Sequence, residues 1–188
     1  MSRIRYALRW FIVGLSLAGI WQGGIAALAA GKAWLAPILV ERAWLAAGDG
    51  PPRPPWPGAD GRPAGLIEVP DRGIIRHVLS DASMRMLAFG PVAIKTDAAR
   101  TYFGHNDTHF SFLRHLKKND VVLVTGDDRV RRSYKVTDLR VAEEDAIRLP
   151  LDETDAEDRV VLITCYPFDA SVSHSSQRYV VTAMAMQE

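Results

Sequence analysis

The chain has 188 residues, of which 48% are hydrophobic and 24% charged. Lysine and arginine number 23 and aspartate and glutamate 22, so the formal net charge of +1 lacks the basic excess typical of nucleic-acid-binding proteins. The single cysteine excludes a disulfide framework within the chain and a multi-cysteine zinc site. The length corresponds to one domain with additional segments.

The N-terminal segment predicts a membrane anchor. An uncharged run from Trp10 to Ala30 follows Arg3, Arg5 and Arg9. About 20 helical residues cross the hydrocarbon core of a bilayer, so the run is long enough to span it. Arginines ahead of the span predict a cytoplasmic N-terminus and export of the rest of the chain. A cleaved signal peptide ending at the small residues 27–29 and a buried helix of a soluble protein are the alternatives.

The next segments predict a helix and a stiff tether. Residues 33–48 carry large side chains about one helical turn apart, and the sequence Gly48-Asp49-Gly50 ends the helix. Six prolines lie between residues 51 and 63. Because proline fixes φ and lacks an amide donor, this stretch is predicted to be an extended spacer. In the alternative, Trp56 packs the stretch against the domain.

From Leu66 onward the hydrophobic period changes to the two-residue alternation of strands. One helix is expected at residues 111–118, with Phe112, Leu113 and Leu116 facing the core. Short strands with one or two short helices predict a closed mixed barrel or a sandwich. The acidic residues between 152 and 158 predict a solvated loop, with a calcium site as the alternative. The predicted strands are residues 66–69, 74–79, 91–95, 121–125, 133–141, 160–164 and 179–184.

Cys165 is the first candidate for chemistry. It ends the apolar run from Val160 to Thr164 and precedes Pro167, which cannot continue a central strand. The thiol is therefore expected at a strand end, where a barrel opens. A lone cysteine is often a small buried hydrophobic residue, but an exported thiol with no disulfide partner is also a candidate nucleophile.

A thiol becomes a nucleophile when a base or a cation stabilises the thiolate. The base candidate is His105 in the sequence GHNDTHF, where the preceding Gly104 is expected to let the chain turn. A metal site is the alternative for this segment, although the other histidines lack ligand-like spacing. The cation candidate is Arg178, which would lie beside Cys165 if their strands pair.

The order of these three residues resembles that of the sortases, a family of membrane-anchored cysteine transpeptidases. LITC (162–165) is similar to the TLxTC pattern of the family. The boxes GPV (90–92), GHNDTHF (104–110), TCYPFD (164–169) and RYVV (178–181), with the hairpin at Gly126-Asp127, resemble the Gram-negative marine-proteobacterial subgroup called class GN. One departure is Asn106, where the family usually has arginine.

The resemblance implies a mainly β fold, a sortase-like eight-stranded closed β-barrel with one or two short helices, preceded by an N-terminal transmembrane helix. It implies a cytoplasmic tip and anchor at residues 1–31, a juxtamembrane helix and Pro-rich tether at 32–64, and a catalytic barrel at 65–188. The protein would then be a single-pass protein of the inner (cytoplasmic) membrane, with its catalytic domain outside the cytoplasm.

The resemblance also implies roles for individual residues. Cys165 would be the nucleophile, His105 the general acid and base, and Arg178 the donor to the substrate carbonyl and the developing oxyanion. No metal or organic cofactor is implied. The expected partners are a substrate protein with a C-terminal sorting signal, an amine acceptor and the lipid bilayer, and no nucleic acid. Supporting roles are expected for Asp107, Thr108 and His109, and substrate contacts for Thr164, Ile147, Leu149 and Leu151.

Two rival functions differ in the state of the thiol. A cysteine enzyme of the L,D-transpeptidase type would need arginine two residues after the cysteine, where this chain has Pro167. A non-catalytic, membrane-anchored β-barrel that binds a partner would need only the fold, and its Cys165 would be inert. An activated, accessible thiolate reacts with an alkylating reagent at neutral pH, whereas a core thiol does not.

Overall fold

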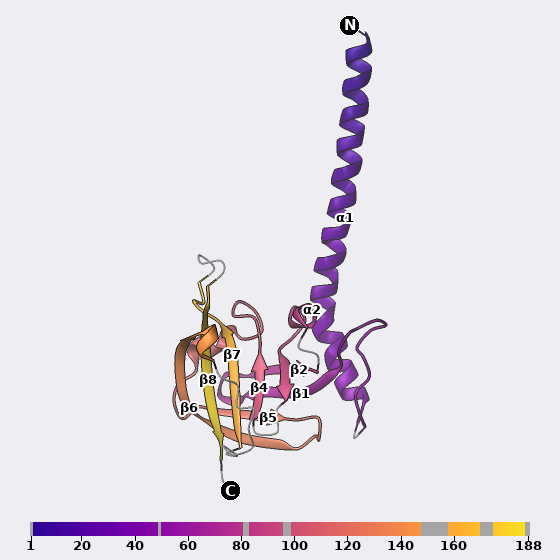
Figure 1. Ribbon diagram of the computed structural model, residues 1–188. Helices are drawn as coiled ribbons and strands as arrows, with labels where there is room; N and C mark the ends of the chain where they lie inside the picture. Colours follow the sequence, from indigo (N-terminus) through magenta and orange to yellow (C-terminus); the bar gives the residue numbers. More distant parts are fainter. Residues whose placement is uncertain are drawn as a thin grey trace. The chain divides into compact units, whose positions relative to one another are not determined.

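In the computed structural model, residues 2–48, 50–80, 83–95, 99–147, 158–169 and 175–186 are described (Figure 1). The chain forms two compact units, residues 1–36 and 37–188. Helix α1 (Ser2–Ala46) is continuous and contributes to both units. The first unit is entirely helical in its described part, and the second contains the strands.

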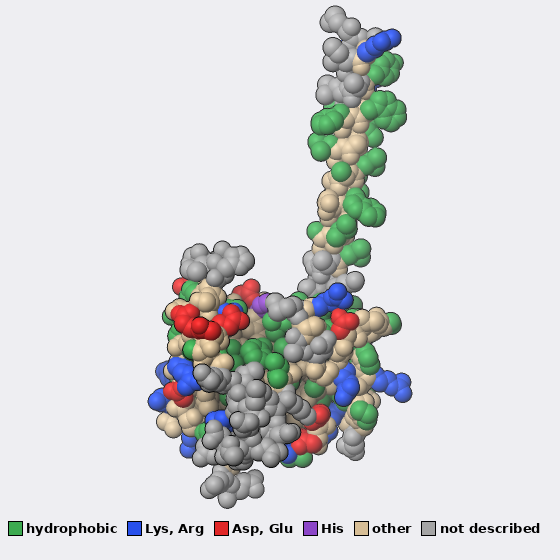
Figure 2. All heavy atoms as spheres, viewed as in Figure 1, with side chains coloured by type: hydrophobic (Ala, Val, Ile, Leu, Met, Phe, Trp, Pro, Cys, Tyr) green, Lys and Arg blue, Asp and Glu red, His purple; other side chains and the backbone are tan. Residues whose placement is uncertain are grey.

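Within α1, residues Arg9–Leu28 are long and apolar enough to cross a membrane, with a mean hydropathy of 1.7. Figure 2 shows hydrophobic side chains along this helix, and Trp10 and Trp21 are each 71% exposed. A helix with apolar side chains exposed on all sides is typical of a membrane span. The helix is therefore a candidate anchor, as its sequence predicts.

The second unit is built on a closed barrel in the order β1-β2-β3-β4-β7-β8-β6-β5 (Figure 1). Within the described residues, the pairs β2–β3 and β4–β7 are parallel, and all other neighbours are antiparallel. The eight-stranded closed barrel predicted from the sequence is confirmed. Its strands are β1 (Pro63–Val69), β2 (Ile74–Leu79), β3 (Val92–Lys95), β4 (Ala99–Phe103), β5 (Val121–Thr125), β6 (Arg131–Glu143), β7 (Arg159–Cys165) and β8 (Gln177–Ala185).

The structure adds one strand to the predicted set and shortens the predicted helix. β4 is not among the strands that the sequence predicts; it pairs with β3 directly before it and with β7 far along the chain. The helix expected at 111–118 is instead the 3₁₀ helix η2 (Ser111–His115), although Phe112, Leu113 and Leu116 are buried as expected. The remaining short helices are η1 (Pro70–Arg72), α2 (Met84–Leu87) and η3 (Glu144–Ala146).

Two apolar clusters stabilise this unit. The larger fills the barrel and includes Ile67, Tyr102 and Leu162. The smaller contains Val40 of α1, together with Leu79 and Val92 of the barrel wall. Residues on one strand alternate between the two sides of the sheet, so β2, β3 and β4 contribute to both clusters.

The end of α1 and the segment after it pack on the barrel. Arg129 donates from Nη2 to the carbonyl oxygen of Trp44 at 3.0 Å, and its guanidinium carbon lies 3.5 Å from the centre of the Trp44 ring. Trp56 contacts Phe89 edge to face, with ring centres 5.1 Å apart. The Pro-rich stretch thus has the packing contact that the sequence left as an alternative to a free spacer.

Gly104 follows β4 and is buried. The sequence predicts that a glycine here lets the chain turn, but the structure gives a different reason for it. Its backbone does not take a left-handed φ. A Cβ atom at this position would instead lie 2.6 Å from the Phe110 ring, which is fully buried in the barrel cluster. The glycine therefore permits a close approach of this ring to the backbone.

This contact predicts the effect of Gly104→Ala. The added methyl group must displace a packed ring, so we expect unfolding to become easier by about 1–3 kcal/mol. Thermal or denaturant unfolding of the full chain in detergent measures the change. In a Phe110→Leu background the smaller side chain relieves the clash, so the cost of Gly104→Ala should shrink. An equal cost in both backgrounds would contradict this explanation of Gly104.

Candidate functional site

Cys165 and Arg178 lie on the neighbouring strands β7 and β8, and His105 lies two residues after β4. Cys165, the last residue of β7, is the direct antiparallel partner of Arg178 on β8. Residues directly opposite in such a pair have Cβ atoms about 5 Å apart. The sequence placed Arg178 beside Cys165 only if their strands pair, and this pairing is present. Cys165 is exposed at the strand end, as its position before Pro167 predicts.

His105 is brought to the same place by the parallel pairing of β4 with β7. The register Phe103↔Ile163 is extended by one residue, because the Gly104 amide donates to the Ile163 carbonyl oxygen at 3.2 Å. The Thr164 hydroxyl donates to the Gly104 carbonyl oxygen at 2.6 Å. One step further along this register, His105 is level with Cys165.

Strand alternation assigns Cys165 and Arg178 to one face. Tyr102, Leu162 and Val181 belong to the barrel cluster, so their side chains face inward. Side chains at odd positions of β7 and at even positions of β8 then face outward. His105 lies two residues beyond the end of β4, beside this end of β7.

Arg178 is held by several polar contacts. Its Nη1 donates to the carbonyl oxygens of Ser175 at 2.8 Å and of Gln177 at 2.9 Å. Its Nη2 lies 2.7 Å from Oε2 of Glu144 in η3. The Arg178 side chain is 20% exposed and the Glu144 side chain 65% exposed.

Sequence reasoning did not find Glu144. Nothing in the local pattern of residues 143–146 distinguishes this carboxylate from its exposed neighbours. The contact depends on the register of β6 with β8, in which Glu143 pairs with Gln177 and Ala142 with Arg178. The neighbouring Glu143 accepts hydrogen bonds from the Ser176 hydroxyl at 2.6 Å and the Gln177 amide at 3.0 Å, which lower the pKa of its carboxyl group.

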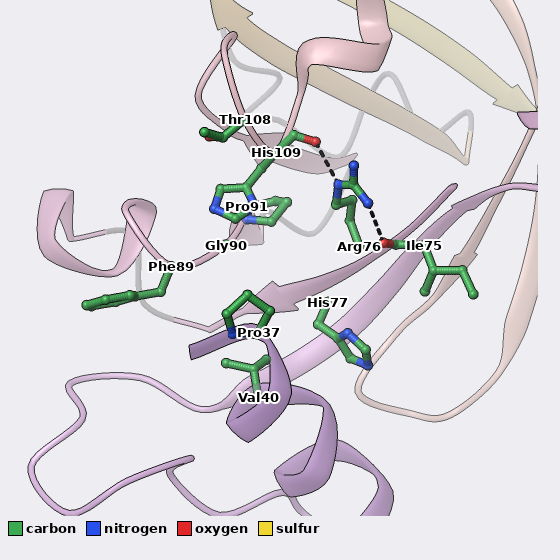
Figure 3. Close-up of a pocket in the computed structure, with 10 residues that line it drawn as sticks. All are labelled: Pro37, Val40, Ile75, Arg76, His77, Phe89, Gly90, Pro91, Thr108 and His109. Atoms are coloured by element: carbon green, nitrogen blue, oxygen red, sulfur yellow. Dashed lines mark hydrogen bonds between the residues drawn. The ribbon is translucent and has the colours of Figure 1, made fainter. Parts of the chain in front are cut away.

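The second histidine of the GHNDTHF box has a different environment. The carbonyl oxygen of His109 accepts a hydrogen bond from Nε of Arg76 at 3.2 Å. Its ring helps to line a cavity of about 300 Å³ beside Pro37, His77 and Pro91 (Figure 3). Burial lowers the pKa of His109, while a hydrogen bond with the Ala88 backbone partly opposes this shift. His105, Cys165 and Arg178 do not line this cavity.

The remaining predicted site residues are dispersed. Thr164 is 3% exposed, and its hydroxyl is bonded to the backbone of the histidine segment. Ile147 is half-buried directly after η3, whereas Leu149 and Leu151 lie outside the described residues. Asp107 and Thr108 are exposed.

The TCYPFD box forms contacts around the site that its sequence did not reveal. Asn106 donates from Nδ2 to the Pro167 carbonyl oxygen at 2.8 Å, which links the histidine segment to the residues after Cys165. Tyr166 and Phe168 pack against Tyr179 of β8, with ring centres 6.2 and 5.2 Å from the Tyr179 ring. The neighbours of both Cys165 and Arg178 thus form one aromatic cluster.

A metal site was an alternative for the histidine segment. In the described part of the chain, no group of three or more His, Cys, Asp or Glu side chains is arranged to hold a metal ion. For the acidic residues between 152 and 158 the sequence left a calcium site as an alternative. Residues 152–157 lie outside the described residues, and Oδ1 of Asp158 accepts a hydrogen bond from the Tyr134 hydroxyl at 3.0 Å.

Comparison with known proteins places these observations in one family. The family described as "Sortase domain" matches residues 67–186. This range includes β4, β7 and β8 together with His105, Cys165 and Arg178. A sequence search of curated proteins gave no match.

Solved structures share the fold. A lid mutant of sortase A from Corynebacterium diphtheriae is 21% identical and has a TM-score of 0.53, with 70% of this chain and 74% of that chain covered. Sortase A from Listeria monocytogenes is 21% identical and has a TM-score of 0.57, with 66% of this chain and 88% of that chain covered. Sortase C-1 from Actinomyces oris is 23% identical and has a TM-score of 0.51, with 66% of this chain and 74% of that chain covered.

The half-buried histidines His77 and His109 predict a loss of stability at mildly acidic pH. Burial lowers the pKa of both His77 and His109 below the ordinary value, although the charge of Glu41 opposes the shift at His77. An unfolded histidine binds a proton below about pH 6.5, whereas the folded protein resists this proton. The free energy of unfolding should therefore fall as the pH drops from about 7 to about 5.5, above the range in which ordinary carboxylates titrate.

Denaturant unfolding of the full chain at several pH values measures this slope. His77→Gln and His109→Gln should each flatten it, whatever they do to stability at about pH 8, where both histidines are neutral in both states. Equal slopes in the wild type and in both variants would contradict the role of burial.

Proposed function

Since the chain belongs to the sortase family, we propose that it is a membrane-anchored cysteine transpeptidase. In this proposal it cleaves a C-terminal sorting motif of a substrate protein and transfers the cleaved protein to an amine acceptor. The single observation that carries the proposal is the register of three adjacent strands. The pairing Cys165↔Arg178 and the extension of Phe103↔Ile163 toward His105 support the proposal, because they bring the residues that carry a thiol, an imidazole and a guanidinium to the same end of neighbouring strands.

The first half of the reaction forms a thioacyl-enzyme. The Cys165 thiolate attacks the carbonyl carbon of the scissile peptide bond, so a carbon–sulfur bond forms and the carbonyl oxygen becomes an oxyanion. The His105 imidazolium then protonates the departing amine as the carbon–nitrogen bond breaks. The exposure of Cys165 at the end of β7 supports this role, because the sulfur must be reachable by a polypeptide.

The second half transfers the acyl group to the acceptor. Neutral His105 takes a proton from the incoming amine, whose nitrogen attacks the thioester carbonyl. The carbon–sulfur bond breaks and the Cys165 thiolate is regenerated. Arg178 donates hydrogen bonds to the substrate carbonyl and to both oxyanions, since a preorganised donor stabilises charge where it develops. No step requires a metal or an organic cofactor.

Other residues are proposed to bind substrate or support the site. Ile147, Leu149 and Leu151, between β6 and β7, would line the groove for the sorting motif. Thr164 contributes through the backbone, because its hydroxyl holds the Gly104 carbonyl and thus the start of the histidine segment. Asp107, Thr108 and His109 would support the segment that carries His105.

We further propose the location and subgroup of the protein. Residues 1–31 would form a cytoplasmic tip and a single span of the inner membrane, residues 32–64 a juxtamembrane helix and tether, and residues 65–188 an extracytoplasmic catalytic barrel. The uncharged run behind three arginines supports this orientation. The order of the GPV, GHNDTHF, TCYPFD and RYVV boxes supports membership of class GN.

Substitutions at the two histidines and the cysteine test the chemistry. His105→Ala should lose about 10²- to 10⁴-fold in turnover, the contribution of a general acid and base. His109→Ala should keep a measurable fraction of turnover and lose stability, because its ring is half-buried at the cavity wall. Cys165→Ala should form no covalent substrate adduct, with a stability cost of about 1 kcal/mol or less.

The measurements are turnover of a pool of motif peptides with an added amine, mass spectrometry of adducts, and melting curves. Alkylation of Cys165 at neutral pH in the wild type is the control that distinguishes an active enzyme from an inert binding barrel. A covalent adduct on Cys165→Ala would refute the nucleophile assignment. A folded but inactive His109→Ala alongside an active His105→Ala would require the two roles to be exchanged.

The topology has its own test. A reporter fused after Glu188 should be active only outside the cytoplasm, and the mature chain should retain residues 1–30, because the run from Trp10 has the length of a span. Protein sequencing of the mature N-terminus checks the second point. A mature chain starting near Ala30 would show that the segment is a cleaved signal, without affecting the enzyme assignment.

A further inference from the structure

The carboxylate of Glu144 is the acidic group that contacts Arg178. Its Oε2 lies 2.7 Å from Nη2 of Arg178, the short distance of a charge-assisted hydrogen bond. Asp145, the next residue of η3, is also exposed and acidic, but neither a hydrogen bond nor an ion pair is found for its side chain within the described residues. The contact is thus specific to one of two adjacent carboxylates.

The backbone of Glu144 is fixed relative to the start of β8. Its amide donates to the Ser176 carbonyl oxygen at 2.9 Å. The preceding Glu143 accepts hydrogen bonds from the side chains of Ser176 and Gln177. The last residue of β6 and the residue after it are therefore bonded to the residues just ahead of Arg178, and Glu144 reaches the guanidinium from an anchored position.

The contacts of the guanidinium leave it able to bind substrate. A guanidinium has five N–H donors in a fixed plane. The bonds to the carbonyl oxygens of Ser175 and Gln177 and to Glu144 use at most three of them. Within the described residues, Nε–H and at least one further N–H have no hydrogen-bond partner. The directions of these donors are set once the other edge of the guanidinium plane is held.

We propose that Glu144 is a positioning residue, whose carboxylate orients the Arg178 guanidinium so that its remaining N–H donors face the acyl group on Cys165. This inference rests on the function proposed above. Arg178 starts from the strand position directly opposite Cys165, so a rotation of its long side chain decides whether the donors reach the reacting carbonyl. Glu144 and the two backbone carbonyls restrict that rotation from one side.

The contact is suited to orientation rather than to stability. Ion pairs between exposed side chains contribute little to folding, and the Glu144 side chain is 65% exposed. Loss of the carboxylate should therefore leave the fold intact. It should lower turnover, because a small misplacement of a catalytic donor is costly in rate.

The experiment compares Glu144→Ala with Asp145→Ala in the full chain in detergent micelles. The two changes remove the same charge from adjacent residues, and only the first removes a contact with Arg178. The probe is the peptide most reactive with the wild type in the motif pool, with hydroxylamine as the amine. We expect Glu144→Ala to lower kcat about 10- to 100-fold with little change in KM, and Glu144→Asp to restore part of it. The melting temperatures of the Glu144→Ala and Asp145→Ala variants should stay within about 4 °C of the wild type.

A second readout does not depend on substrate. The ¹⁵Nε–H resonance of Arg178, assigned by its absence in Arg178→Lys, reports the order of the guanidinium. Its heteronuclear NOE should fall in Glu144→Ala and stay unchanged in Asp145→Ala. Equal behaviour of these two variants in both readouts would overturn the proposal, as would faster turnover in Glu144→Ala, which would mean that the carboxylate competes with substrate for Arg178.

Failure of the proposed function gives a different result. If the wild type turns over no peptide in the pool, the transpeptidase assignment fails, and the NMR readout alone decides whether Glu144 orders Arg178. An unchanged NOE in Glu144→Ala would then overturn the positioning role as well.

Discussion

The parallel pairing of β4 with β7 is the constraint on which the site depends. It joins the segment before His105 to the segment before Cys165, with five residue pairs from Ala99↔Arg159 to Phe103↔Ile163. Two further bonds extend the pairing beyond the ladder, one from the Gly104 amide and one from the Thr164 hydroxyl. This register also brings the backbone of the histidine segment to the end of β7 where Cys165 lies.

Close packing maintains this register. Tyr102 and Leu162 are paired and both lie in the barrel cluster, so a slip of one residue would move a buried aromatic ring to the outer face. Gly104 lets the Phe110 ring approach the backbone from inside the barrel, and Phe110 leads directly into η2, whose Phe112 and Leu113 are buried. The segment bearing His105 is thus held at both ends by the core.

The third residue of the site depends on a different part of the barrel. Arg178 is set opposite Cys165 by the β7–β8 pairing, but its contacts come from the end of β6 and the turn before β8. The long pairing of β6 with β8 ends at Glu143↔Gln177, and Glu144 follows immediately. The pairing with β7 therefore sets the position of Arg178, and the residue directly after β6 orients its guanidinium. Different parts of the barrel thus set the place and the direction of this group.

The sequence by itself determined the candidate span, most strands and the candidate residues, because these depend on local patterns. A predominantly apolar window of 20 residues forms a helix long enough to cross a bilayer, alternating residues form strands, and the strand end at Cys165 follows from the proline two residues later. Only the tertiary structure revealed β4, the reason for Gly104 and the role of Glu144 as a partner of Arg178. Two of these are contacts between segments distant in the sequence: β4 with β7, and Glu144 with a side chain 34 residues away. The third, between Gly104 and the Phe110 ring, is close in the sequence but depends on the packing of that ring in the barrel. Local patterns do not tell which distant strand is the partner, and the pairing of β6 with β8 decides which of two adjacent carboxylates meets the arginine.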